Sequence, residues 1–328
     1  MTDLGPLILS VFALAVLGTG GILCWFKDRA GSENPSGRPG DASFPPPEDG
    51  GLAITSTILL VWAILVATGY AEPAALPIIA LAFLLMGLSW LSGFRESSQR
   101  LHIFLHAGAA IAAVFLLDDD ARIFQGLLPY FFDRALAALL WVWFISIYER
   151  MDRIDGMTGI ETISIGLGLI LVPEFYGAAL PATVAAAGLG FLIWNWHPAQ
   201  ITLGKSGSFP LGFLLGWLLL NQAAQGQWVA ALILPSYYLV EIVITQTGHL
   251  FRRSPVPLFC DRAIQGGLTP SAISLIVLFT NGALIALAVW SVHHPIAALL
   301  GAGMTLATLL WLFRIRELDA KKIASIPK

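Results

Sequence analysis

The sequence predicts an all-α, polytopic integral membrane protein, and three observations support that fold class. Of the 328 residues, 57% are hydrophobic and 12% are charged, whereas ordinary soluble domains carry about a quarter charged residues. The mean hydropathy is +0.77. The apolar residues also form long runs with short polar connections between them, and such runs become helices because lipid offers the backbone no hydrogen-bond partners.

The same composition excludes several classes of protein. Soluble enzymes and secreted scaffolds are excluded because so much apolar surface is incompatible with folding in water. The net charge of −3 provides no basic surface for a nucleic acid. The two cysteines, Cys24 and Cys260, are far apart in the sequence, so we predict no disulfide framework. We expect a single transmembrane domain over residues 1–328.

Eleven apolar stretches each approach the roughly 20 residues that a bilayer-spanning helix needs. The first has no basic segment in front of it and is long enough to span, so we interpret it as a retained helix and not as a signal peptide. The hydrophilic segment 27–50 is rich in Gly, Pro and Ser and is predicted to be a cytosolic loop. The expected helices cover residues 5–26, 51–71, 73–91, 101–117, 131–148, 158–176, 178–194, 208–224, 228–247, 270–290 and 295–313.

The placement of Lys and Arg predicts the orientation of the chain. With the N-terminus outside, 16 of the 18 basic residues lie in cytosolic connections or in the tail, residues 314–328. Only Arg122 and Arg134 remain for the outer side. Because cytoplasmic loops carry the excess of basic residues, we expect an N-out, C-in chain whose function faces the cytosol. The acidic run Asp118–Asp120 then lies outside.

A group of carboxylates follows the fifth expected helix. Glu149, Asp152 and Asp155 are spaced three residues apart, which places them on one face if the helix continues. Carboxylates at a membrane boundary can hold Mg²⁺ or activate a nucleophile. The spacing by itself favours a solvated turn with ion pairs to Arg150 and Arg153, and it leaves both interpretations open.

A second polar segment precedes the eighth expected helix. It contains Asn195 and then the glycine-rich run Gly204-Lys205-Ser206-Gly207-Ser208. A glycine-rich loop that enters a helix can present backbone N–H groups to a phosphate, although the spacing is not that of a P-loop. The alternative is an ordinary helix start with Ser206 or Ser208 as the capping residue.

These two segments resemble glycosyltransferase family 4, the polyprenyl-phosphate N-acetylhexosamine-1-phosphate transferases. The first match covers residues 141–161, WVWFISIYERMDRIDGMTGIE, which resembles WVWFxNLYNFMDGIDGIAGxE. The second covers residues 191–213, FLIWNWHPAQITLGKSGSFPLGF, which resembles WNWxPAxxFMGDxGSxxLGF. Residues 45–54, PPPEDGGLAI, and residues 237–246, YYLVEIVITQ, resemble two further family segments, and the matches occur in the family's order.

The resemblance implies a cytosol-facing cleft in the bacterial cytoplasmic membrane. There a sugar-1-phosphate would pass from a UDP-sugar to undecaprenyl phosphate, the first membrane step in the synthesis of cell-envelope polysaccharide or peptidoglycan. The resemblance implies Mg²⁺ as the cofactor, with Asp152 and Asp155 in catalytic and metal-binding roles. The residues assigned to substrate binding are Asn195, Gly204, Lys205, Ser206, Gly207, Ser208, Arg252, Arg253 and Arg262.

Three departures from the family pattern fall on the metal site. The family's paired aspartates after the third helix are Ser92 and Gly93 here, and the aspartate of its MGD motif is Lys205. Because Mg²⁺ is held by oxygen ligands, a lysine ammonium at that position repels the ion. We therefore expect Lys205 to face Asp152 and Asp155 as a substitute for the cation, or else to point into the cytosol.

The sequence leaves three functions open. The chain is a working transferase for a UDP-sugar and polyprenyl phosphate, a catalytically degenerate relative that binds lipid phosphate or nucleotide or regulates an active paralogue, or a transporter. The transporter is least supported, because repeat halves and broken midplane helices are not evident. The expected partners are the lipid bilayer, polyprenyl phosphate and a UDP-sugar, with a homodimer left open and no nucleic acid.

Overall fold

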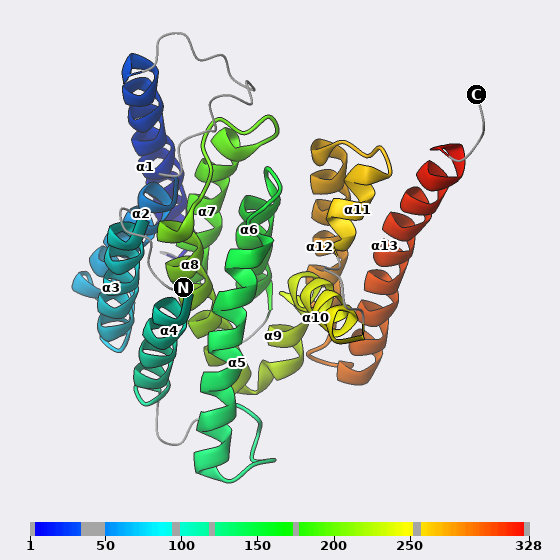
Figure 1. Ribbon diagram of the computed structural model, residues 1–328. Helices are drawn as coiled ribbons and strands as arrows, with labels where there is room; N and C mark the ends of the chain where they lie inside the picture. The colour runs from blue at the N-terminus through cyan, green and yellow to red at the C-terminus, as the bar shows by residue number, and fades with distance from the viewer. Residues whose placement is uncertain are drawn as a thin grey trace.

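The computed structural model of the chain describes residues 4–33, 50–93, 99–117, 122–172, 177–251 and 257–324, and every regular element in these ranges is a helix (Figure 1). The helices are α1 (Leu4–Glu33), α2 (Gly50–Ala67), α3 (Ala75–Gly93), α4 (Gln99–Val114), α5 (Tyr130–Met151), α6 (Met157–Leu171), α7 (Ala179–Asn195), α8 (Lys205–Gln222), the π-helical turn η1 (Ala223–Gln227), α9 (Trp228–Ile233), α10 (Ser236–Phe251), α11 (Phe259–Gln265), α12 (Pro270–Trp290) and α13 (Pro295–Ala324).

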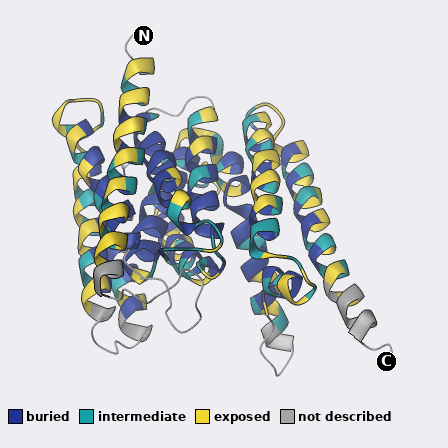
Figure 2. Ribbon diagram, turned by 90° about the horizontal axis from the view of Figure 1, so that it is seen from above, coloured by how far each residue is buried: buried dark blue, intermediate teal, exposed yellow. Residues whose placement is uncertain are grey.

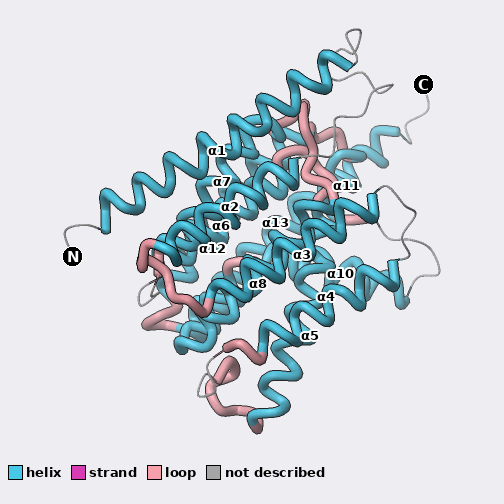
Figure 3. The backbone as a smooth tube through the Cα atoms, turned by 90° about the vertical axis from the view of Figure 1, so that its left-hand side faces the viewer, coloured by secondary structure: helices cyan, strands magenta, loops and turns pink. Residues whose placement is uncertain are grey.

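The all-α polytopic fold is confirmed, and each apolar stretch expected from the sequence contains helix. Within the described ranges, five helices are long and apolar enough to cross a membrane by themselves, and α3, α4, α6 and α7 contain shorter apolar helices. Helices run side by side with their connections gathered at the two ends (Figure 3). The number of eleven spans and the N-out orientation stay predictions.

The ninth expected span, residues 228–247, is wrong as a single helix. α8 continues through the π-helical turn into the short α9, and α10 then departs at 65°. Gly226 in the turn has φ 94°, and Pro235 lies between α9 and α10, where its missing N–H and its ring prevent the helix from continuing. α10 is therefore seen almost end-on in Figure 1.

The predicted loop 27–50 also begins later than expected, because α1 continues to Glu33. The sequence did not predict α11, a short helix between α10 and α12. Asp118–Asp120 lie outside the described residues.

The distribution of buried and exposed residues is that of a membrane protein. Buried residues gather inside the bundle and exposed residues cover the outer faces of the peripheral helices (Figure 2). Large apolar side chains such as Phe104 on α4 and Ile296 on α13 are among the exposed ones. Outward apolar side chains are the arrangement that lipid favours, since the bilayer replaces water around them.

Glycines allow the central helices to approach closely. A Cβ at Gly166 of α6 would lie 2.9 Å from the backbone of Ala185 on α7, and one at Gly190 of α7 would lie 2.8 Å from the carbonyl oxygen of Val16 on α1. Small residues at such contacts are typical of helices packed in lipid, where van der Waals contact drives association.

The start of α2 is held against the loop before α8. The Gly50 N–H donates to the carbonyl of Thr202 at 3.1 Å, and the Gly51 N–H donates to that of Leu203 at 2.8 Å. A Cβ at Gly51 would collide with the backbone of Gly207. The glycines of the PPPEDGGLAI segment thus bring α2 directly onto the glycine-rich segment.

We expect Gly51→Ala to lower the free energy of unfolding by about 1–3 kcal/mol, the usual cost of overpacking, because the backbone atoms of Gly207 cannot move aside. The matched control is Gly20→Ala in α1, where a Cβ would meet nothing within 4 Å. Thermal unfolding of the solubilised protein measures both. A Gly51→Ala protein as stable as the Gly20→Ala protein would contradict the close approach.

Orientation is testable at two exposed residues on opposite ends of the bundle, Arg153 after α5 and Gln225 after α8. In a background in which the exposed Cys24 is replaced by serine, we expect Arg153→Cys to react with a membrane-impermeant maleimide only from the cytosolic side. Gln225→Cys should react only from the outer side, as the distribution of basic residues predicts. The reverse pattern in intact cells and inverted vesicles would refute the N-out orientation.

Candidate active site

The carboxylate segment forms the turn between α5 and α6. α5 ends at Met151, and Gly156, with φ 81°, precedes the first residue of α6. A left-handed backbone at this position favours glycine because it has no Cβ. The side chain of Thr158 donates a hydrogen bond of 2.8 Å to Asp152 Oδ1. Asp152 and Asp155 are therefore part of a tight turn and do not continue the face of α5.

The Asp155 carboxylate connects this turn to the connection between α7 and α8. Its Oδ2 lies 2.7 Å from His197 Nδ1 and accepts the Ala199 N–H at 3.0 Å. Its backbone carbonyl accepts the Ser274 hydroxyl of α12 at 2.8 Å. Sequence reasoning missed His197, which stands at a variable position of the family pattern. Its only signal was a polar side chain between two motif residues.

Asn195 makes a second bridge between the same two connections. Its Oδ1 accepts the Gly156 N–H at 2.9 Å, and its Nδ2 donates to the carbonyl of Ile201 at 3.0 Å. The side chain is buried, so both of its polar ends are used to satisfy backbone groups that water does not reach. In this structure Asn195 positions the two connections, and its assignment to substrate binding stays a prediction.

The glycine-rich segment begins α8 without a side-chain cap. Gly204, with φ 67°, is the N-cap residue, and its carbonyl accepts the N–H groups of Gly207 at 3.2 Å and Ser208 at 3.0 Å. Ser206 and Ser208 are buried. The interpretation of either serine as the capping residue is therefore wrong, because the backbone of Gly204 takes that position.

Lys205 lies in a polar pocket of about 310 Å³ between α4, α5 and α8. Arg150 and Glu149 line the same pocket, together with Ser146. The carboxylate that shares the pocket with Lys205 is therefore that of Glu149, whereas that of Asp155 contacts His197. The remaining lining residues are His102, Ile103, His106 and Phe209.

An apolar groove of about 530 Å³ lies beside this pocket, along α4 and α5. Ile103 lines both cavities. Away from the pocket the groove is lined by side chains such as Ile111 and Leu139, and it reaches Arg134 near the far end of the bundle. A cationic pocket at one end of the bundle and an apolar groove along its side are thus neighbours across the Ile103 side chain.

The other predicted substrate residues are only partly described. Arg262 on α11 is buried, its Nε donates to the carbonyl of Pro257 at 3.1 Å, and its guanidinium lies 4.7 Å from the centroid of the Phe259 ring. Arg252 and Arg253 lie outside the described residues, as does the side chain of Ser92. The expected convergence of these residues in one cleft therefore stays a prediction.

The described residues do not fit the Mg²⁺ ion that the resemblance implies. Mg²⁺ is usually bound through one or two free carboxylates, with water and substrate phosphates as its other ligands, and no group of three His, Cys, Asp or Glu side chains among the described residues could hold a metal ion. Asp155 Oδ2 is already occupied by His197 and Ala199, and the neighbouring pocket carries the two cations Lys205 and Arg150.

Comparison with known proteins agrees with this geometry. Residues 74–223 match glycosyl transferase family 4. The match includes α3 to α8, the helices that carry both connections, and it confirms the resemblance found in the motifs.

Three proteins that are similar to this chain are named as transferases. A probable undecaprenyl-phosphate N-acetylglucosaminyl 1-phosphate transferase of Bacillus subtilis is 27% identical over 63% of this chain and 60% of its own length. A putative glycosyltransferase of Streptomyces coelicolor is 30% identical over 65% and 54%. A phospho-N-acetylmuramoyl-pentapeptide-transferase of Moorella thermoacetica is 33% identical over 37% and 41%. The matched region thus spans only part of each relative.

We expect Asn195→Ala to destabilise the protein by about 1–3 kcal/mol, the cost of leaving a buried polar group unpaired, since the Gly156 N–H and the Ile201 carbonyl both lose a partner. The control is Asn221→Ala, whose Nδ2 bonds only the Trp217 carbonyl of its own helix. Thermal unfolding compares the two variants. Equal melting temperatures would show that Asn195 does not hold the connections together.

Proposed function

We propose that the chain transfers a sugar-1-phosphate from a UDP-sugar to a polyprenyl phosphate such as undecaprenyl phosphate. The observation that carries this proposal is the cationic pocket around Lys205 next to the apolar groove along α4 and α5, with Ile103 lining both. The family match supports it. The reaction belongs to cell-envelope synthesis in the bacterial cytoplasmic membrane, with the pocket on the cytosolic side.

The polar pocket and the apolar groove beside it match the phosphate and the isoprenoid chain of a polyprenyl phosphate. The phosphate is polyanionic, and the ammonium of Lys205 and the guanidinium of Arg150 supply charge-assisted hydrogen bonds at the pocket. The isoprenoid chain is apolar, and the groove past Ile103 offers it an apolar wall. A soluble nucleotide needs no such groove, which favours the lipid acceptor as the occupant of these cavities.

The transfer itself needs positioning and charge neutralisation. A phosphate oxygen of the lipid attacks the phosphorus that bears the sugar, a new P–O bond forms, and the P–O bond to UMP breaks with its electron pair leaving on UMP. Fixed cations stabilise the charge that develops on the phosphoryl oxygens. We assign that role to Lys205 and Arg150, while Asp155 and His197 hold the connection beside them.

A second candidate function is lipid-phosphate binding without turnover. The replacement of the family pattern's aspartates by Ser92, Gly93 and Lys205 favours it, because the ordinary metal-assisted route of phosphoryl transfer uses carboxylate ligands. Both candidates require the same acceptor pocket, and they differ only in whether UMP is released.

We expect Lys205→Met to weaken the binding of undecaprenyl phosphate about tenfold or more, because a charge-assisted contact to the phosphate contributes about 1.5–3 kcal/mol. The control is Lys27→Met on α1, which removes the same charge at the same end of the bundle but outside the pocket. Binding is measured by microscale thermophoresis in lipid nanodiscs. Equal affinities of the two variants would exclude Lys205 from the acceptor site.

Turnover then separates the two candidate functions. The reconstituted protein is incubated with undecaprenyl phosphate and a panel of UDP-sugars, and released UMP and lipid-linked sugar phosphate are measured with Mg²⁺ and with EDTA. We expect release of UMP that persists in EDTA, because the described residues do not fit Mg²⁺. Lipid binding without UMP release from any sugar would establish the binding protein, and turnover abolished by EDTA would contradict the metal-free site.

A further inference from the structure

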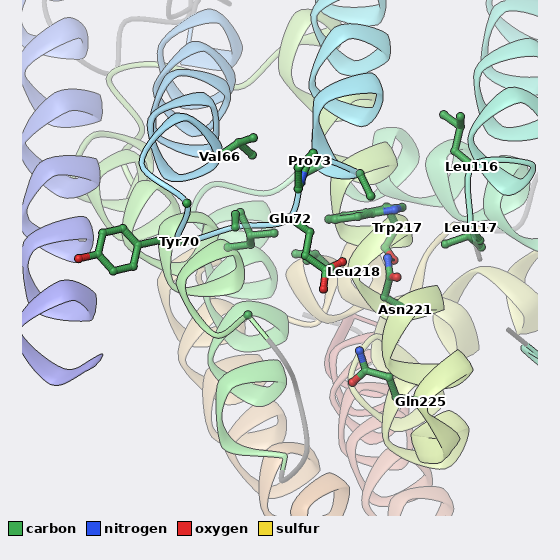
Figure 4. A pocket seen from close by; sticks show the side chains of 16 residues that line it. Val66, Tyr70, Glu72, Pro73, Leu116, Leu117, Trp217, Leu218, Asn221 and Gln225 are labelled. Carbon is green, nitrogen blue, oxygen red and sulfur yellow. The ribbon is translucent and has the colours of Figure 1, made fainter. Parts of the chain in front are cut away.

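A third cavity, of about 500 Å³ and shown in Figure 4, is separate from the other two. It lies at the end of the bundle opposite the candidate active site. α8 begins with Lys205 in the polar pocket, and its last turn lines this other cavity. The α2–α3 turn and the ends of α4 and α7 complete the wall. Neither of the two motif segments contributes a residue, so the cavity is separate from the proposed transfer site.

Three polar side chains line this cavity. Glu72 comes from the α2–α3 turn, Asn221 from the last turn of α8, and Gln225 from the π-helical turn that follows (Figure 4). Asn221 Nδ2 donates to the Trp217 carbonyl at 2.9 Å, which leaves its Oδ1 for a ligand. Within the described part of the chain, the side chains of Glu72 and Gln225 have no hydrogen-bond partner. π-helical turns of this kind are frequent at functional sites.

The rest of the wall is aromatic and aliphatic. Trp217 packs at 5.6 Å, between ring centroids, against the buried Trp62, which holds its indole beside the space. Leu180 and Leu218 lie around it. No Lys or Arg of the described chain lines this cavity, so a phosphate or a carboxylate ligand would find no cation there.

We propose that this cavity binds a neutral saccharide. Sugar hydroxyls both donate and accept hydrogen bonds, and the carboxamides of Asn221 and Gln225 do the same, while the Glu72 carboxylate accepts. The face of a pyranose ring is apolar and packs on an indole such as that of Trp217. The volume lies within the roughly 300–1,000 Å³ of small-molecule sites.

The test uses the full chain in lipid nanodiscs, since maltoside detergents carry a sugar headgroup themselves. Saturation-transfer NMR measures the binding of maltose. We expect Gln225→Ala to weaken it about three- to tenfold, the net worth of one hydrogen bond. The matched control is Gln227→Ala in the same turn, because Gln227 does not line the cavity, and it should bind maltose as the unmodified protein does.

A second arm distinguishes a free sugar from a lipid headgroup. Dodecyl maltoside, a sugar linked to an alkyl chain, is added to the nanodisc in trace amounts and competes with maltose for the cavity. If dodecyl maltoside competes for the cavity more strongly than free maltose does, the site is assigned to a glycolipid headgroup. Equal competition assigns it to a free saccharide. The proposal is overturned if maltose gives no saturation transfer, if both glutamine variants lose binding equally, or if tetramethylammonium binds at this site and maltose does not.

Discussion

The Asp155 carboxylate is the contact on which the candidate active site depends. It joins the turn after α5 to the connection before α8, although His197 is 42 residues away in the chain. Asn195 bridges the same connections through the Gly156 N–H and the Ile201 carbonyl. Because buried backbone groups must be paired, these contacts fix where the loops lie, and the loops in turn place Lys205 at the start of α8.

This arrangement gathers cations in the pocket at the start of α8. Lys205 and Arg150 share a pocket with the carboxylate of Glu149, and the carboxylate of Asp155 is held by His197. A lysine ammonium is a compact point charge that can stabilise a phosphoryl group without dedicated metal ligands. The site therefore keeps positive charge at the membrane boundary while it uses its aspartates to hold the loops.

The sequence predicted much of the fold and a smaller part of the site. Length and hydropathy are local properties, so they located the helices, from α1 at one end of the chain to α13 at the other. They missed the break between α9 and α10, because residues 228–247 are predominantly apolar and only Pro235 marks the bend within them. Motif matches located Asp152, Asp155 and Asn195 but not His197, whose partner is distant in sequence.

By itself, the sequence determined that this chain is a helical membrane protein and that two connections between its helices carry motifs. Apolar runs and motif spacing depend only on the order of the residues. Only the tertiary structure decided which groups meet: that Asp155 contacts His197, that Lys205 shares a pocket with Glu149, and that this pocket lies beside the groove along α4 and α5. The physical reason is that these contacts join helices brought together by packing at glycines such as Gly51, and packing depends on the whole bundle.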